Sequence, residues 1–221
     1  VVVATEPEKT HRQTVAAYYD PAIAGHTKRP VAKVKDAPLD ERKIIARRAA
    51  MEIKPGDVVN LGYGMPEAVG HVAAEEGLSD SITLTLECGI IGGVPLGGAN
   101  FGSALNAHAV MPMSQQFDFY NGGGLDVAFL GFAEVNEKGD INVSSFGGRF
   151  AGCGGFIDIS QATKTIFFVG TLTTGGLEEH VEDGKLVIDK EGSRMKFIDA
   201  LPQRTFNGTY ALKQGHKITF I

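Results

Sequence analysis

The segment that most constrains the fold is 83–93, which reads TLTLECGIIGG. The apolar, β-branched run over 82–86 is typical of a buried strand, and one carboxylate, Glu87, follows it directly before a glycine-rich turn. In an open α/β sheet, ligands bind in the crevice beyond the carboxyl ends of the strands. Gly89, Gly92 and Gly93 would let the main chain approach such a ligand, because they carry no Cβ. Two interpretations stay open for Glu87: a nucleophile at a ligand site, or a strand-ending acid that hydrogen-bonds its own turn.

The length fits one large α/β domain with a substantial core, or one domain with an appendage. Glycine is unusually frequent, at 29 of 221 residues against a typical ~7%, and most glycines fall between residues 62 and 176 without a fixed period. They therefore mark many tight turns. The net charge of −5 offers no broad basic surface, so we expect no nucleic-acid partner.

Cys88 and Cys153 are too few for a disulfide framework and suit a reducing cytoplasm. Neither has a histidine at metal-ligand spacing, so we expect no metal site. No signal peptide is visible, and no apolar run approaches the ~18 residues that a membrane span requires, so we expect no membrane association.

The order of elements predicts an α/β fold with an open, mostly parallel sheet flanked by helices. Asp40 is placed to cap a helix over 41–53, and its basic residues fit a solvated helix face better than a phosphate site. A strand over 58–61, a loop over 62–67 and a second helix ending near 76–77 follow. Further core strands are expected over 127–135 and 165–169, whereas 103–110 is compatible with a helix. Turns at 183–184 and 191–192 indicate a C-terminal hairpin layer.

Both ends of the chain look like strands without partners. The opening VVVAT and the closing KITFI are apolar and β-prone, and prolines interrupt the polar run between the first and the next predicted element. We therefore expect residues 1–34 to belong to a preceding unit, with a boundary near Lys35, and the last strand to continue past residue 221.

Two glycine clusters are candidate ligand loops. Gly62 and Gly64 could direct N–H groups at a phosphate or a pantetheine arm, but a simple strand-to-helix turn is the favoured explanation. Gly152, Gly154 and Gly155 offer several unobstructed N–H groups and form a candidate oxyanion hole. Asn106 has no assigned role, and His108 is expected to be structural, because lone histidines usually are.

These motifs resemble a known family. The segments VNLGYGMPEAV, TLECGIIGGVPLGG and 116–176, from QFDFYNGGG to VGTLTTGG, are similar to the carboxyl half of the family I coenzyme A transferases of the acetate, propionate and acetoacetate type. The resemblance covers roughly residues 36–221 and extends to the CoA-transferase / NagB-RpiA-like fold. Cys88 stands where some relatives carry another residue.

The resemblance implies that Glu87 attacks an acyl-CoA thioester, giving an acyl-glutamyl anhydride and then a glutamyl-CoA thioester. A carboxylate with a pKa near ~4.3 is ionised at neutral pH and needs no general base for this step. Gly62, Gly64, Gly152, Gly154 and Gly155 would surround the thioester and the CoA arm. No tightly bound cofactor is implied, since coenzyme A is a substrate.

The resemblance also implies partners and a division of the chain. Residues 1–34 would be the tail of an amino-terminal half or a linker, and residues 35–221 the catalytic half of a cytoplasmic homo-oligomer. Its substrates would be an acyl-CoA and a short-chain carboxylic acid. Three alternatives stay open: an acyl-CoA hydrolase that uses the same glutamate, a sugar-phosphate isomerase of related fold, whose motifs are not found here, and a noncatalytic subunit or fragment.

Overall fold

The computed structural model describes residues 3, 5–6, 12–30 and 37–221. Within this part of the chain, the centre is a seven-stranded sheet in the order β17-β12-β7-β1-β2-β3-β6. Strands β17 to β2 in this order are parallel, β3 is antiparallel to β2, and β6 is antiparallel to β3. The predicted open, mostly parallel sheet is therefore confirmed. The bounds are β1 (Val58–Leu61), β2 (Thr83–Leu86), β3 (Ile90–Ile91), β6 (Ala109–Val110), β7 (Val127–Leu130), β12 (Thr165–Phe168) and β17 (Lys217–Phe220).

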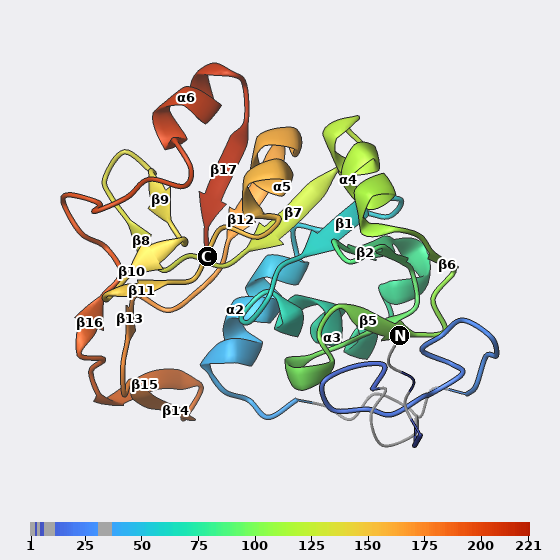
Figure 1. Cartoon of the computed structure of the whole chain (residues 1–221). Helices are drawn as coiled ribbons and strands as arrows, with labels where there is room; N and C mark the ends of the chain where they lie inside the picture. Colours follow the sequence, from blue (N-terminus) through green and yellow to red (C-terminus); the bar gives the residue numbers. More distant parts are fainter. Residues whose placement is uncertain (1–2, 4, 7–11, 31–36) are drawn as a thin grey trace.

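Helices cover both faces of this sheet (Figure 1). One face carries α2 (Glu41–Ala50) and α3 (Glu67–Glu75), which pack with β1 and β2 around Val59, Leu61 and Leu84. The other face carries α4 (Met113–Asn121), α5 (Phe156–Ala162) and α6 (Gly208–Lys213) over a second apolar cluster. Because both faces are covered, the central strands are buried without a clean polar–apolar alternation, as the sequence indicated.

The first helix begins and ends for local reasons. Asp40 caps α2 by accepting a hydrogen bond from the Lys43 N–H at 2.9 Å, which confirms the predicted cap. The helix ends at Ala50, three residues before the predicted end. Arg47 and Arg48 lie in its last turn, where cations interact favourably with the helix dipole, and they form ion pairs with Glu76 and Glu52.

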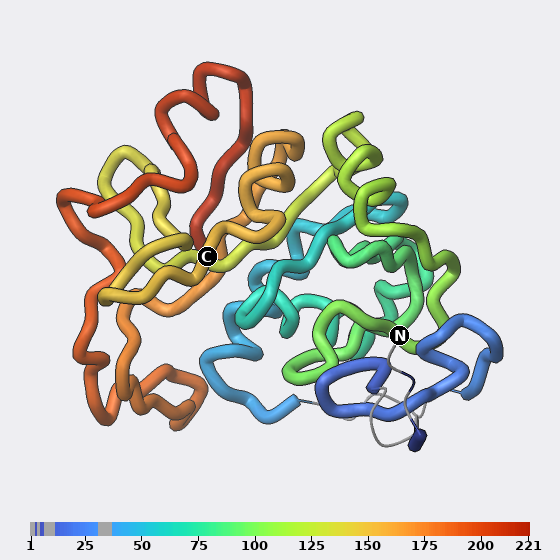
Figure 2. Tube along the Cα trace, viewed as in Figure 1, coloured from blue at the N-terminus to red at the C-terminus, as the bar shows by residue number. Residues whose placement is uncertain are grey.

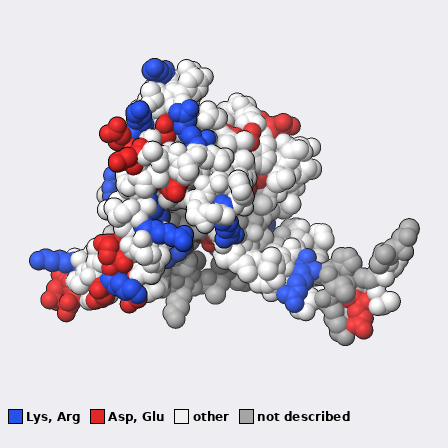
Figure 3. Space-filling view, turned by 60° about the vertical axis from the view of Figure 1, so that its left-hand side comes forward, with Lys and Arg blue, Asp and Glu red and all other residues white. Residues whose placement is uncertain are grey.

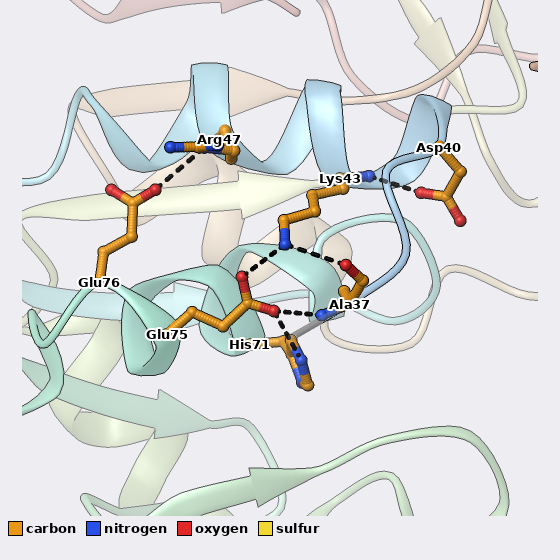
Figure 4. Close-up of polar contacts among 7 residues, drawn as sticks. All are labelled: Ala37, Asp40, Lys43, Arg47, His71, Glu75 and Glu76. Atoms are coloured by element: carbon orange, nitrogen blue, oxygen red, sulfur yellow. Dashed lines mark hydrogen bonds and ion pairs between the residues drawn. The ribbon is translucent and has the colours of Figure 1, made fainter. Parts of the chain in front are cut away.

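A polar cluster joins α2 to α3 (Figure 4), and we call it the Glu75 clasp. The Glu75 carboxylate lies 2.9 Å from Lys43 Nζ and 3.0 Å from His71 Nε2, and it accepts a hydrogen bond from the Ala37 N–H. Lys43 Nζ also donates to the Ala37 carbonyl. The side chains of Lys43 and Glu75 are only 12% and 7% exposed, so the clasp pins the segment before α2 onto α3.

Two sequence predictions about individual elements are wrong. The predicted strand over 127–135 is interrupted: β7 ends at Leu130, and β8 (Glu134–Val135) leaves the sheet to pair with β9 (Ile141–Asn142). The helix-compatible segment 103–110 forms β5 (Ser103–Leu105), which pairs with β4 (Val94–Leu96), and then β6. Backbone φ is positive at Gly102 and at Asn106 (58°), and such residues cannot continue a right-handed helix.

Smaller elements complete the chain. The predicted hairpin is confirmed as β14 (Glu178–Glu182) and β15 (Lys185–Lys190), with φ of 50° at Asp183 and 74° at Gly184, the positive angles that a tight hairpin turn prefers. It stands at one end of the molecule, away from the central sheet (Figure 2). The remaining elements are η1 (Ser79–Ser81), η2 (Gly98–Asn100), β10 (Ser145–Phe146), β11 (Arg149–Phe150), β13 (Thr173–Thr174) and β16 (Arg194–Met195).

The chain ends differ from expectation in one respect. KITFI is not unpaired, because β17 pairs with β12 along four residue positions and extends the central sheet. VVVAT falls mostly outside the described residues, as does the boundary near Lys35. The described segment 12–30 contacts the body of the fold: the Asn106 side chain bonds both the N–H and the carbonyl of Arg29, at 3.1 and 2.8 Å. This contact gives Asn106 a structural role.

Candidate active site

Glu87 leaves the sheet at the carboxyl end of β2, next to the centre. Its strand is paired with β1 on one side and with β3 on the other, so the backbone before it is fixed. The turn that follows is tight, since the Gly89 N–H donates to the Leu86 carbonyl at 3.0 Å. Gly89 has φ of 104°, and a Cβ there would collide with the Met111 carbonyl oxygen. The sequence therefore places the carboxylate on a rigid support.

The side chain of Glu87 meets the second glycine cluster. A methyl group at Gly155 would collide with Oε2 of Glu87 and would lie 2.7 Å from Cζ of Phe117. Only a glycine fits between these two side chains without a shift. The structure thus brings Glu87 and Gly155 together, although they come from the ends of β2 and of the loop before α5.

The electrostatic surroundings raise the pKa of Glu87. Burial is the largest cause, because it disfavours the charged form, and the negative charge of Asp158 adds to it. A backbone hydrogen bond from Gly155 opposes the shift. The neighbours of Glu87 therefore stabilise its charged form only in part. This state is more typical of reactive carboxylates than of structural ones.

The other glycines of this cluster differ in what their N–H groups do. The Gly152 N–H donates to the Ser144 carbonyl at 3.1 Å, so it is occupied. The Gly154 N–H forms no hydrogen bond with any residue that the structure describes, and a Cβ at Gly154 would meet nothing within 4 Å. Gly154 is thus the glycine of this loop whose N–H can still serve a ligand.

The first glycine cluster does not direct N–H groups at a ligand. The Gly62 N–H donates to the Phe129 carbonyl at 2.9 Å, and the Gly64 N–H donates to Glu67 Oε1 at 2.7 Å. Gly62 lines the pocket beside Glu87 and packs tightly against Leu130, whereas Gly64 is not among the lining residues. The Gly62 and Gly64 N–H groups therefore serve the strand-to-helix turn, which is the interpretation that the sequence favoured.

Glu87 and the second glycine cluster line a common pocket of about 470 Å³. This volume lies within the ~300–1,000 Å³ range of small-molecule sites. The walls come from the carboxyl ends of β1, β7 and β12, where ligands of open α/β sheets bind. The lining is mainly apolar and includes Tyr63, Met65, Phe101, Leu130, Phe132, Phe146, Phe156 and Val169, together with Lys196 and Cys153.

A buried polar network lies behind Glu87 and was not recognised in the sequence. The Tyr120 hydroxyl donates to Thr85 Oγ1 at 2.9 Å and accepts from Asn60 Nδ2 at 3.1 Å. Burial raises the pKa of Tyr120, hydrogen bonds from its neighbours oppose this, and the charge of Glu87 adds a smaller upward contribution. Gln116 is fully buried beside this network. The network ties α4 to β1 and β2 beneath the carboxylate.

Both cysteines are free thiols. The pKa of Cys88 is raised, mainly by burial and then by the charge of Glu87, so its thiol is less nucleophilic at neutral pH than a free cysteine. Cys153 lines the pocket as a free thiol. His108 is exposed on the turn after β5, and its imidazole packs against Gly92.

In the part of the chain that the structure describes, no three His, Cys, Asp or Glu side chains gather to hold a metal ion. Among the same residues, none of the helices is both long and apolar enough to cross a membrane. Basic and acidic side chains are interspersed on the face that Figure 3 turns forward.

Known proteins similar to this chain identify its family. The family model described as Coenzyme A transferase matches residues 42–176. The chain is 45% identical over 226 aligned positions to caffeate CoA-transferase from Acetobacterium woodii, covering 100% of this chain and 43% of that protein. It is 49% identical to acetate CoA-transferase YdiF from Escherichia coli K12, covering 83% of this chain and 35% of that protein.

Solved structures of YdiF from E. coli O157:H7 share the fold. The apoenzyme aligns with a TM-score of 0.85 at 43% identity, over 97% of this chain and 39% of that one. A structure described as a thioester complex with CoA aligns with a TM-score of 0.77 at 46% identity, over 87% of this chain and 37% of that one. The chain thus spans less than half the length of these relatives. With its strand-end glutamate, its glycine loop and a family match over most of its length, the chain belongs to the coenzyme A transferase family, as the resemblance predicted.

Proposed function

We propose that this chain carries the nucleophile of an enzyme that transfers coenzyme A between a short-chain acyl-CoA and a carboxylic acid. The observation that carries the proposal is the position of Glu87, which ends a central strand, lines the pocket and lies against Gly155. The family membership and the names of the two relatives support the reaction class. The YdiF structure described as a thioester complex with CoA supports a route through a thioester.

In the first half-reaction, an oxygen of the Glu87 carboxylate attacks the carbonyl carbon of the acyl-CoA. A C–O bond forms, the C–S bond breaks, and CoA leaves as a thiolate, so the enzyme holds an acyl-glutamyl anhydride. The thiolate then attacks the glutamyl carbonyl carbon. The anhydride C–O bond breaks, the first acid leaves as a carboxylate, and CoA is joined to Glu87 as a thioester.

The second half-reaction repeats these steps in reverse with another acid. Its carboxylate attacks the glutamyl carbonyl and expels the thiolate, and the thiolate attacks the new acyl group and frees Glu87. Charge and electron pairs balance without an external proton, oxidant or reductant. Each addition develops an oxyanion, and one preorganised donor is worth ~3 kcal/mol to such a step. The free N–H of Gly154 is the donor that we assign to this task, with Gly155 holding the carboxylate.

We infer that the acid pocket is completed by the part of the relatives that lies outside the length matched by this chain. The pocket is open to solvent in the described residues, and the chain covers 43% and 35% of the two relatives. Adding the amino-terminal part in trans is therefore expected to increase transfer by the chain. Equal activity with and without it would contradict this inference.

The test of the reaction class compares acid release with and without an acceptor acid. A transferase releases the first acid stoichiometrically with enzyme when no acceptor is present and catalytically when one is added. Catalytic release without an acceptor would identify a hydrolase instead. Glu87→Asp withdraws the carboxylate by one methylene, and a misplacement of this size costs ~100-fold in rate. Transfer unchanged in Glu87→Asp would contradict the assigned nucleophile.

A further inference from the structure

The pocket that holds Glu87 also contains an ammonium group with no role in the chemistry above. Lys196 follows β16, and its Nζ lies 4.9 Å from the centre of the Phe132 ring. Nζ also lies 3.2 Å from the position that a Cβ on Gly170 would occupy. Among the residues that the structure describes, no carboxylate is within ion-pair distance of it. A partly buried cation over an apolar wall is costly unless an anion joins it.

The place of Lys196 along the sheet defines its distance from the reacting carboxylate. Phe132 and Gly170 follow the carboxyl ends of β7 and β12, which are two and three strands from β2 in the sheet order. Because neighbouring strands lie ~4.8 Å apart, the ammonium is roughly 10–14 Å from the end of the strand that carries Glu87. An attacking acid must bring its carboxylate within ~3.5 Å of the glutamyl carbonyl, and we infer that Lys196 serves a part of the ligand that lies further along the pocket.

The phosphates of coenzyme A are at a suitable distance. The diphosphate is separated from the sulfur by about a dozen bonds, which span about 15 Å at the ~1.2 Å per bond of an extended chain. With the sulfur bonded to Glu87, a pantetheine arm that follows the apolar pocket would bring the diphosphate near Lys196. Lysine is a common phosphate ligand in proteins.

A second cavity of about 610 Å³ begins where the first one ends. The two cavities share Ala133, Phe146 and Lys196, so the ammonium lies at their junction. Arg194 also lines the second cavity, without an ion-pair partner among the described residues. Glu134 contributes a carboxylate to this cavity, and its Oε2 accepts a hydrogen bond from Asn142 Nδ2 at 2.7 Å.

We propose that Lys196 binds a phosphate of coenzyme A at the junction of the two cavities, with Arg194 as a second, more exposed cation. This inference rests on the proposed function, because it requires the sulfur of CoA to lie at Glu87. Burial lowers the pKa of Lys196, and a bound phosphate would favour its charged form.

The experiment compares the binding of two ligands, CoA and pantetheine, which lacks the phosphates. Dissociation constants are measured by calorimetry for the full protein and for its Lys196→Met variant, which keeps an unbranched side chain but removes the charge. Lys196→Met is expected to weaken CoA binding about tenfold and to leave pantetheine binding unchanged. The CoA affinity of the variant should also depend less on salt concentration.

The control variant is Lys190→Met. Lys190 lies on the β14–β15 hairpin, 3.0 Å from Glu178, and lines neither cavity. It should bind both ligands as the wild type does. Equal weakening of CoA and pantetheine by Lys196→Met, unchanged affinity for both, or a raised KM for the acid alone would overturn the assignment. Wild-type protein that binds no CoA would instead overturn the proposed function itself.

Discussion

Two glutamates show how differently one fold can surround the same functional group. Glu75 is held in the clasp between α2 and α3 by Lys43, His71 and the Ala37 N–H (Figure 4). The Ala37 hydrogen bond is the largest cause of its lowered pKa, and the Lys43 contact follows. Glu87 has one backbone hydrogen bond, from Gly155, and Asp158 nearby, and its pKa is raised.

The contrast separates a structural carboxylate from a reactive one. At Glu75 every contact favours the charged form except burial, so the ion is stabilised and its lone pairs are engaged. At Glu87 burial outweighs the Gly155 hydrogen bond, and the charge of Asp158 adds a smaller upward contribution to the pKa, so the ion is held in place but poorly stabilised. A carboxylate in the second state is the better nucleophile, because less stabilisation is lost when it attacks.

The largest expected effect comes from removing each charge in turn. Glu87→Gln replaces the nucleophile by an amide of the same shape, and we expect transfer to fall by ~10⁴-fold or more. The matched change Glu75→Gln lies outside the pocket, so transfer should stay within about threefold of the wild type. Steady-state transfer rates of the two variants check this prediction. Equal losses of transfer activity in both variants would contradict the distinction between a reactive and a structural carboxylate.

Gly155→Ala should displace the Glu87 side chain but leave its carboxylate group chemically unchanged. The collision of the added methyl group with Oε2 and its 2.7 Å approach to Phe117 Cζ force the carboxylate to move, and we expect a loss of ~100-fold in kcat/KM. Gly148→Ala is the control: its Cβ meets nothing within 4 Å, it does not line the pocket, and the positive φ of 74° costs only ~1–2 kcal/mol in stability. An equal loss of kcat/KM in Gly148→Ala would show that the close contact between Gly155 and Glu87 is not the cause.

The two glutamates should also have opposite effects on stability. Glu75→Gln leaves Lys43 largely buried without its counter-ion, so the free energy of unfolding at neutral pH should fall by ~2 kcal/mol. Because the folded-state pKa lies below the unfolded value of ~4.3, the wild-type advantage is complete above that value and is lost as the pH falls through the folded pKa.

For Glu87 the sign is reversed. Its folded-state pKa is raised, so the native state binds the proton more tightly and the wild type loses stability as the pH rises above ~4.3. Glu87→Gln should therefore be at least as stable as the wild type at pH 7, with the difference closing under acid. Urea unfolding at several pH values tests both glutamates, and a Glu87→Gln variant destabilised at pH 7 would contradict the assignment.

The smallest effect concerns the acid limb of the activity profile. Transfer requires an ionised Glu87, so kcat/KM should rise with pH through a pKa above the ordinary glutamate value. Asp158→Asn removes a like charge and should move this limb to lower pH by a few tenths of a pH unit. A limb that moves upward, or one that Glu75→Gln moves equally, would assign the titration to another group.

The sequence predicted the parts of the site that depend on local pattern. A buried strand ending in Glu87 and a glycine cluster at 152–155 are both visible in the residue order, and the structure places Gly155 against the carboxylate. A strand-to-helix turn at 62–67 was the favoured interpretation, and the Gly62 and Gly64 N–H groups serve it by donating to the Phe129 carbonyl and to the side chain of Glu67. The same residue types serve a ligand or a turn, and only the tertiary contacts decide between them.

Strand pairing between distant parts of the sequence explains the other differences between the predicted and the observed structure. KITFI joins the central sheet because β12 offers a free edge, which no local pattern reveals. Lys196 and Tyr120 reach the surroundings of Glu87 from segments distant in the sequence, one over the ends of β7 and β12 and the other from within α4. Their positions near the site depend on the strand order, which the local sequence pattern does not determine.

The most direct measurement is to locate the covalent bond. The enzyme is incubated with an acyl-CoA in the absence of an acceptor acid, treated with borohydride and digested, and the peptides are analysed by mass spectrometry. A thioester on Glu87 is expected to be reduced to an alcohol at that residue, with loss of activity, and Cys88→Ala and Cys153→Ala should give the same product. An acyl group on Cys88, together with an inactive Cys88→Ala variant, would contradict the assignment of Glu87 as the nucleophile.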